Sequence, residues 1–264
     1  MKPATPIFII SCNRLKVLQT TIQSFREHIR TPFEIVIHDS RSTFPPLLAY
    51  LRELEREGTA VYFHRKRIVR PEQLDVVAET VADWLGRHGP RHYVVTDPDI
   101  ALVGGCGDIL EFYGSLLDTH PGIDVVGPML RIDDIPDSYP LKEKVIERHT
   151  SQFWHKQPLD LEWKGRRVQY QHAPIDTTFG MYRGDFRFRR MCSGYRTYEP
   201  YWARHLDWYI DPKDMTPDQA YYLRHSSSVS HWGGAWLRRE LYWPGWLKAF
   251  GAWATTCLDR LRGS

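Results

Sequence analysis

The sequence lacks several features that would assign it to a common class of protein. Its four cysteines lie far apart and form no Cys-x-x-Cys pair, which argues against a cysteine-based zinc site and against a disulfide scaffold. No apolar stretch is long enough to span a bilayer, and the apolar run at 7–10 is too short for a signal peptide. We therefore expect a soluble protein of a reducing compartment, the cytoplasm.

An excess of charge and the usual catalytic motifs are also missing. Lys plus Arg is 35 and Asp plus Glu is 32, so the net charge of +3 is too small for a general nucleic-acid binder. The sequence contains no Walker P-loop, no Gly-x-Gly-x-x-Gly, no His-Glu-x-x-His and no Gly-x-Ser-x-Gly. These absences weaken an assignment to kinases, dehydrogenases, zincins or serine hydrolases. What is present is an ordinary globular composition, 42% hydrophobic and 25% charged over 264 residues.

Strand and helix signals alternate over the first hundred residues. Short apolar runs with β-branched residues predict four strands, at 6–12, 33–38, 61–63 and 93–96. Apolar residues at helical spacing predict three helices between them, at 14–29, 45–57 and 71–85. Strands that alternate with helices form parallel sheets covered on both faces. We therefore expect an α/β fold with a mostly parallel sheet flanked by helices.

The second half of the chain is less regular. Further elements are predicted as a strand at 124–127, a strand within 169–183, a helix at 217–224 and a strand or extended segment at 227–232. Residues 131–158 are polar, aromatic and punctuated by proline, which is typical of a long functional loop with short helices. We expect one catalytic domain over 1–240, followed by a separate C-terminal segment.

Two carboxylates directly follow the fourth predicted strand, in the run Asp97-Pro98-Asp99. Two such groups at a strand end can share a hard cation, which can in turn hold phosphate oxygens. The pattern itself is common, and Asp-Pro-Asp is also a good turn. Its position favours the metal site, because ligands of open α/β sheets bind beyond the carboxyl ends of the strands. Ser11, Asn13 and Asp39 follow or end the first two predicted strands at the same edge.

Together the strand ends SCNR at 11–14, HDSRS at 38–42 and TDPD at 96–99 resemble a known family. They are similar to the GT-A fold of nucleotide-sugar-dependent glycosyltransferases, broadly to glycosyltransferase family 2, over about residues 5–130. The resemblance implies a nucleotide pocket lined by Ser11, Asn13, Arg14, Asp39 and Asp97. It also implies that Asp97 and Asp99 hold Mn²⁺ or Mg²⁺ on the diphosphate of the donor.

Each of these polar residues also has a structural role open to it. Asn13 can cap a helix, Asp39 can form a turn, and Arg14 can be a solvated residue of a first helical turn. A further metal ligand is implied near the end of the catalytic domain, where His231 lies in the run VSHWGG. Neutral imidazole would favour Mn²⁺ over Mg²⁺. With 12 histidines in the chain, a solvated or structural His231 remains an alternative.

The resemblance also implies a general base for the acceptor hydroxyl. In many inverting relatives it is an acid about 25 residues before the terminal histidine, on a helix under the acceptor site. Asp207 precedes His231 by 24 residues, although Leu206 replaces the first acid of the usual Glu-Asp pair. We expect Asp207 to be the base and Asp176 to contact the donor or acceptor sugar, with Asp176 and Asp218 as rival bases.

Aromatic residues are concentrated around the proposed base. They are Tyr195, Tyr198, Tyr201, Trp202, Trp208, Tyr209 and Trp232. Flat aromatic faces pack on the apolar face of a sugar ring, and Tyr and Trp donors reach its hydroxyls. The alternative is that most of these residues belong to the core.

The C-terminal segment, 241–264, is predicted to be an amphipathic helix. Apolar residues recur there at helical spacing, and three tryptophans lie close to basic residues, which suits a helix in a membrane interface. A helix docked on the domain is the alternative. An interfacial helix would place the protein at the inner face of the cytoplasmic membrane and imply a lipid-linked acceptor, as in surface-polysaccharide synthesis. The basic residues, 26 Arg and 9 Lys, suggest a GC-rich bacterial genome.

These observations predict a metal-dependent glycosyltransferase that moves a sugar from a nucleotide-diphosphate donor to a hydroxyl of a glycan or lipid-linked acceptor. Inversion is favoured over retention. A metal-dependent sugar nucleotidyltransferase is one alternative, but it would need a Gly-rich loop that SCNRLKV lacks. The other is a non-catalytic, membrane-peripheral binding protein on the same scaffold, against which Asp97, Asp99 and His231 argue.

Overall fold

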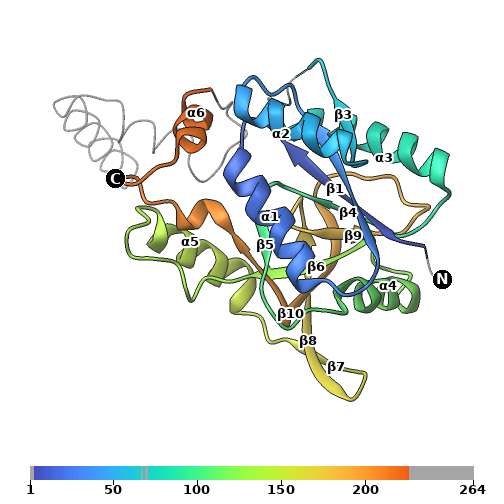
Figure 1. Cartoon of the computed structure of the whole chain (residues 1–264). Coiled ribbons are helices and arrows are strands. Elements are labelled where there is room, and N and C mark those ends of the chain that lie inside the picture. The colour runs from blue at the N-terminus through green and yellow to red at the C-terminus, as the bar shows by residue number, and fades with distance from the viewer. Residues whose placement is uncertain (1–2, 67, 69–70, 226–264) are drawn as a thin grey trace, which may run out of the picture.

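The computed structural model describes residues 3–66, 68 and 71–225 (Figure 1). The strands are β1 (Thr5–Ser11), β2 (Phe33–Asp39), β3 (Ala60–Phe63), β4 (Tyr93–Thr96), β5 (Ile100–Leu102), β6 (Val125–Leu130), β7 (Leu159–Trp163), β8 (Arg166–Ile175), β9 (Gly180–Tyr182) and β10 (Cys192–His205). The α-helices are α1 (Leu15–His28), α2 (Pro45–Arg56), α3 (Asp75–His88), α4 (Ile109–Thr119), α5 (Lys142–His149) and α6 (Pro217–His225). Shorter helical turns are η1 (Pro71–Leu74), η2 (Thr150–Trp154) and η3 (Leu206–Tyr209).

These strands form one sheet in the order β3-β2-β1-β4-β9-β6-β10-β8-β7, and β5 pairs with β10 off this path. Strands β3, β2, β1 and β4 pair in parallel, and so do β6 and β10, while β9 runs antiparallel between β4 and β6. Strands β5 and β8 are antiparallel to β10, and β7 is antiparallel to β8, so seven of these strands run in one direction. The predicted α/β fold with a mostly parallel sheet is confirmed. The carboxyl ends of β1, β2, β4 and β10 meet at one edge of the sheet.

The alternation of side chains along the strands divides the core between the two faces of the sheet. Ile7 and Ile9 of β1 belong to the cluster that includes apolar residues of α1, α2 and α4. Phe8 and Ile10 belong to the cluster that includes residues of α3. Burial of each such side chain contributes about 1.5–3 kcal/mol, so the helices on both faces fix the strands and the edge where they end.

The elements of the first hundred residues largely follow the prediction. The strands at 6–12, 33–38, 61–63 and 93–96 and the helices at 14–29 and 45–57 are confirmed with their ends within one residue. The segment at 71–85 begins as η1 and continues as α3 to His88. The loop-rich stretch at 131–158 contains α5 and η2, as expected, and the helix at 217–224 is α6.

The second half also holds elements that the prediction missed. The long strand β10 and the helix α4 were not predicted, and the region 169–183 contains two strands, β8 and β9, instead of one. Asp207 was expected on a helix under the acceptor site, but it lies in the short turn η3 directly after β10, because β10 pairs with β5, β6 and β8 up to that point. The segments predicted at 227–232 and 241–264 lie outside the described residues. No helix within the described ranges has the length and apolar character needed to cross a membrane.

We predict that Gly194→Ala strongly destabilises the protein. A Cβ at this position of β10 would lie 2.0 Å from the carbonyl oxygen of Val125 in β6. The strands must separate to admit it, so we expect the free energy of unfolding to fall by about 3 kcal/mol or more in urea denaturation. Gly122→Ala is the matched control, since a Cβ there meets nothing within 4 Å. Equal stability of the two variants would contradict the close contact between β6 and β10.

Candidate active site

A cavity of about 530 Å³ opens at the carboxyl edge of the sheet. Its walls come from the segments after β1, β2, β4, β8 and β10, together with α5, η2 and α6. Loops that end parallel strands thus meet here, as ligand sites in open α/β sheets do. Of the residues predicted for the site, the cavity is lined by Ser11, Asn13, Arg14, Asp97, Asp99, Asp176 and Asp207. Asp39 is not among the lining residues, and His231 lies outside the described part of the chain.

Arg14 links the two carboxylates Asp99 and Asp207. Its Nη1 donates to Oδ2 of Asp99 at 2.7 Å, and its Nη2 donates to Oδ1 of Asp207. The three side chains are only 9%, 4% and 8% exposed, and the guanidinium lies 4.6 Å from the ring centroid of Tyr222 in α6. Arg14 lines the cavity. The alternative of a solvated first-turn residue is wrong, because the side chain is buried and two buried carboxylates compensate its charge.

The charges in this group act on one another. Burial opposes the charged form of Arg14, but Asp207 and Asp99 raise the pKa of the guanidinium well above its ordinary value. Burial likewise opposes ionisation of Asp99, while His205 and Arg14 hold the pKa of its carboxyl below the ordinary value. For Asp207, burial prevails over the attraction of Arg14, and the pKa of its carboxyl is raised.

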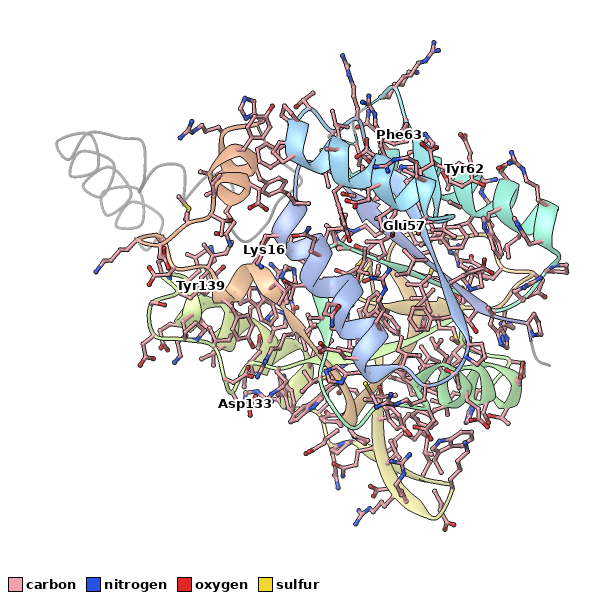
Figure 2. All side chains as sticks on the ribbon, in the orientation of Figure 1. Lys16, Glu57, Tyr62, Phe63, Asp133 and Tyr139 are labelled. Carbon is pink, nitrogen blue, oxygen red and sulfur yellow. The ribbon has the colours of Figure 1, made fainter. Side chains whose placement is uncertain are left out.

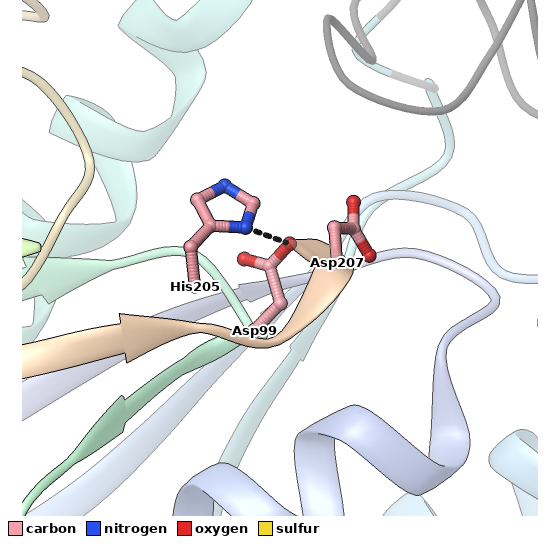
Figure 3. Close-up of side chains that lie close together, drawn as sticks. All are labelled: Asp99, His205 and Asp207. Atoms are coloured by element: carbon pink, nitrogen blue, oxygen red, sulfur yellow. Dashed lines mark ion pairs between the residues drawn. The ribbon is translucent and has the colours of Figure 1, made fainter. Parts of the chain in front are cut away.

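Asp99, His205 and Asp207 form a group that can hold a metal ion (Figure 3). One ligand atom from each lies within 4.8 Å of the others. Nδ1 of His205 is 3.6 Å from Oδ2 of Asp99. Within the described ranges, neither this Nδ1 nor Oδ1 of Asp99 has a hydrogen-bond partner, although both atoms are buried. Two carboxylates and an imidazole with such unpaired atoms are a donor set that fits Mn²⁺.

His205 was not singled out in the sequence. It comes two residues before Asp207, and the run His-x-Asp at the end of an aromatic segment was the available signal. That signal has little weight unless β10 is recognised as a strand, because His205 reaches the carboxyl edge of the sheet, where Asp99 lies, only as the last residue of β10. The pairing of His205 with Ile100 in β5 places the imidazole next to Asp99.

Asp97, in the turn after β4, contacts Thr177 in the segment between β8 and β9. Its carboxylate accepts from Oγ1 of Thr177 at 2.6 Å, and its backbone N–H donates to the carbonyl of the same residue. Burial, followed by the charge of Asp99, raises the pKa of Asp97 to about 8, while Thr177 and Arg190 act in the other direction. Two neighbouring acids in one buried turn therefore do not ionise with equal ease.

The loop after β1 has a partly structural function. Asn13 has a φ of 57°, and its Oδ1 accepts the backbone N–H groups of Thr43 and Phe44, so it fixes the segment that leads into α2 and does not cap the helix that follows it. The expected cap on α1 comes from α6 instead, where Oδ2 of Asp218 accepts the N–H of Lys16. Lys16 is in the first turn of α1 (Figure 2). The contact with Lys16 gives Asp218 a structural role as a cap of α1.

Ser11 and Asp39 end neighbouring strands but differ in their surroundings. Ser11 is fully buried, and among the described residues its hydroxyl has no hydrogen-bond partner. Asp39 accepts from the N–H of Ser42 at 3.0 Å and from the hydroxyl of the same residue. This is the contact of a turn-forming aspartate, which agrees with the structural alternative for Asp39.

Asp176 offers a carboxylate that the protein leaves less engaged. Its side chain is 31% exposed, and its Oδ1 has no hydrogen-bond partner in the described structure. Nη2 of Arg196 lies 3.7 Å from that oxygen. The Arg196 guanidinium is held elsewhere, because it donates to the carbonyls of Pro174 and Pro128 and to the hydroxyl of Thr178.

Few of the aromatic residues predicted for a sugar site line the cavity. Trp208 does, and its ring stacks on His205 with 5.0 Å between centroids. Tyr201 instead packs on Phe112 in the core, which agrees with the alternative interpretation. Phe153 and Trp154 of η2 line the cavity and were not predicted. Trp232 lies outside the described residues.

No family model and no curated protein matches this chain. Among solved structures, TarS 1–349 from S. aureus has a TM-score of 0.44 and 12% identity, over 78% of this chain and 61% of that one. The mannosyltransferase PcManGT from Pyrobaculum calidifontis, in complex with GDP-Man and Mn²⁺, has a TM-score of 0.36 and 19% identity, over 51% and 37%.

A third similar structure is the glucosyl-3-phosphoglycerate synthase of Mycobacterium tuberculosis with Mn²⁺, UDP-Glc and phosphoglyceric acid. Its TM-score is 0.36 and its identity 15%, over 58% of this chain and 51% of that one. This chain thus spans less than two thirds of each of the three proteins. Similarity at these levels supports no inference about substrate or mechanism, which must come from the residues of the cavity.

We predict that Arg14→Met lowers the free energy of unfolding by about 3–5 kcal/mol, because it leaves two buried carboxylates without a compensating charge. Urea denaturation measures the change. Adding Asp207→Asn should recover part of the loss, since one of the two charges is removed. Arg26→Met, on the exposed side of α1, is the control, and we expect a change within about 0.5 kcal/mol. Purely additive effects of the two substitutions would contradict the coupling.

The buried side chain of His38 predicts how the stability of the protein depends on pH. His38 is fully buried, its Nδ1 lies 2.9 Å from Oγ1 of Thr80, and its ring stacks on His64. Burial, and then the charge of His64, lowers the pKa of His38 to about 3. The unfolded chain takes up this proton near pH 6.5 and the folded one does not, so stability falls as the pH drops below about 6.5.

For His38 alone we expect a loss of about 2 kcal/mol between pH 6.5 and pH 4.5. His38→Gln should reduce the pH dependence of urea denaturation by this amount. The exposed His155→Gln should leave it unchanged. An unaltered pH dependence in His38→Gln would show that His38 is not held neutral.

Proposed function

We propose that this chain is a glycosyltransferase that transfers a sugar from a nucleotide-diphosphate donor to an acceptor hydroxyl with the help of a divalent cation. One observation carries the proposal: the cavity at the carboxyl edge of the sheet brings together Asp99, His205 and Asp207, and two of their buried ligand atoms, Oδ1 of Asp99 and Nδ1 of His205, have no hydrogen-bond partner among the described residues. Buried polar atoms are normally paired. Metal-ligating atoms without a hydrogen bond, in a cavity large enough for a nucleotide, support the proposal that a cation binds here.

The cation is proposed to be Mn²⁺, or else Mg²⁺, held by Asp99 and His205. Arg14 occupies Oδ2 of Asp99, so the unpaired Oδ1 is the atom that is available. A bound ion would neutralise charge on the diphosphate leaving group. Asp97 is proposed to contact the ribose or the ion, and Ser11, Asn13 and Arg14 the nucleotide. His231 stays a proposed ligand.

The contacts of the two candidate bases favour Asp176. Asp207, the base expected from spacing, receives the Arg14 guanidinium and is 8% exposed. The side chain of Asp176 is more exposed, and its buried Oδ1 has no hydrogen bond within the described structure. A general base must reach the acceptor hydroxyl and take its proton. We therefore propose that Asp176 takes the proton in an inverting transfer, and that Asp207 serves as the counter-ion of Arg14.

The acceptor is proposed to be a glycan or a lipid-linked sugar of a bacterial surface polysaccharide. Phe153, Trp154 and Trp208 offer the aromatic surface that sugar rings prefer. The proposed membrane contact rests on the sequence pattern of 241–264. A sugar nucleotidyltransferase would require a Gly-rich phosphate loop after β1, where the chain has Cys12, Asn13 and Arg14.

Calorimetry with UDP, GDP, dTDP and CDP, with and without Mn²⁺, tests the proposed function. We expect one nucleotide to bind, and its affinity to require the ion. Asp99→Asn and His205→Gln should each weaken the Mn²⁺-dependent binding at least tenfold, because each removes a ligand. Asp133→Asn, at a side chain that is 61% exposed (Figure 2), is the control and should bind as the parent protein does.

Two outcomes of this titration would contradict the proposals. If the parent protein binds none of the four nucleotides under either condition, the glycosyltransferase assignment is wrong and a non-catalytic protein is favoured. If a nucleotide binds equally well without Mn²⁺ and in both site variants, the metal assignment alone is wrong.

A further inference from the structure

The cavity is lined by four arginines, Arg14, Arg148, Arg190 and Arg196. Two of them have their donors occupied by the protein. Arg14 is held by Asp99 and Asp207. Arg196 donates to two backbone carbonyls and to Thr178. The donors named in these contacts are therefore taken by the protein before any ligand enters.

Arg190 is different. It lies between β9 and β10, and across the described residues its guanidinium makes neither a hydrogen bond nor an ion pair, although its Nε is buried. A buried donor without an acceptor costs free energy, and it gains that energy back when an acceptor arrives. A partly buried arginine that faces a cavity in this state is prepared for an anionic group.

The chain neighbour of Arg190 shows the usual alternative. Arg189 is 65% exposed and pairs with Asp124 at 3.5 Å, and its guanidinium lies 5.3 Å from the ring centroid of Phe186. It does not line the cavity. Two consecutive arginines therefore have opposite surroundings. One is a surface ion pair, and the other is a cavity residue without a protein partner.

The position of Arg190 indicates which anion it meets. Its charge is one of the groups that act on Asp97, so the guanidinium is within electrostatic reach of the Asp97-Pro98-Asp99 turn. In the proposed function this turn faces the diphosphate. A divalent cation leaves negative charge on a nucleoside diphosphate, and a guanidinium binds phosphate oxygens through two parallel N–H groups.

We propose that Arg190 binds the diphosphate of the nucleotide-sugar donor. This inference rests on the proposed function, because it assigns the anion to the donor. It makes Arg190 a binding residue that fixes the phosphates beside the Asp97 turn, separate from the cation held by Asp99 and His205.

Calorimetry on the full chain with Mn²⁺ tests this assignment. The probes are the nucleoside diphosphate that the parent protein binds and the corresponding nucleoside. Arg190→Met should weaken binding of the diphosphate about 10- to 100-fold and leave binding of the nucleoside unchanged. Arg190→Lys should restore part of the affinity, because the charge returns without the planar fork. Arg189→Met is the matched control and should bind both probes as the parent protein does.

Each remaining outcome decides the matter in another way. Equal diphosphate affinity of Arg190→Met and the parent protein would overturn the assignment of Arg190 and leave the proposed function intact. Equal weakening for diphosphate and nucleoside would also overturn it, since Arg190 would then shape the cavity. No binding of either probe by the parent protein would overturn the proposed function itself. Thermal melting of each variant, expected to be unchanged for Arg190→Met, excludes loss of folding as the cause.

Discussion

The ion pairs of Arg14 with Asp99 and Asp207 are the interaction on which the rest of the cavity depends. They join the loop after β1, the turn after β4 and the turn after β10. Asp99 is 85 residues and Asp207 is 193 residues from Arg14 along the chain. Buried ion pairs add little net stability compared with apolar packing, but breaking one partner out of them is costly. Their effect here is to hold the ends of three strands in one arrangement, from which His205 and Asp176 face the same cavity.

This arrangement divides the atoms of the site into two sets. Arg14 takes one oxygen of Asp99 and an oxygen of Asp207, and Thr177 takes one oxygen of Asp97. The atoms left without a hydrogen-bond partner in the described structure include Oδ1 of Asp99, Nδ1 of His205 and Nε of Arg190. The atoms of the first set hold the strand ends together, and the atoms of the second set are available to a ligand. A carboxylate oxygen can bind a cation, and a guanidinium N–H can bind an anion. A site that offers both suits a ligand in which a cation and an anion are bound together.

The sequence predicted the first half of the fold well and the second half poorly, for a physical reason. Strands β1, β2 and β4 are short apolar runs buried on both faces, and the helices between them carry a regular apolar stripe, so local patterns suffice. Strand β10 mixes polar and aromatic residues, and only its pairing with β5, β6 and β8 makes it a strand. The strand-end residues were found because they follow the clear strands. His205 and Arg190 were missed because their positions depend on β10. The ion pairs of Arg14 with Asp99 and Asp207 were missed because these residues are too far apart in the sequence for a local pattern to connect them.

The position of His205 at the end of β10 limits where the chain can gain or lose residues without disturbing the site. The carbonyl of Asp99 accepts the N–H of Leu206 at 2.7 Å, and His205 pairs with Ile100, so Asp99 and His205 are joined through the backbone as well as through their side chains. Side chains alternate between the faces of a strand, and a shift of one residue turns each of them to the other face. The register of the last part of β10 against β6 is set by the irregularity between Thr197 and Trp202. A single residue gained or lost between that irregularity and His205 would therefore point the imidazole away from Asp99.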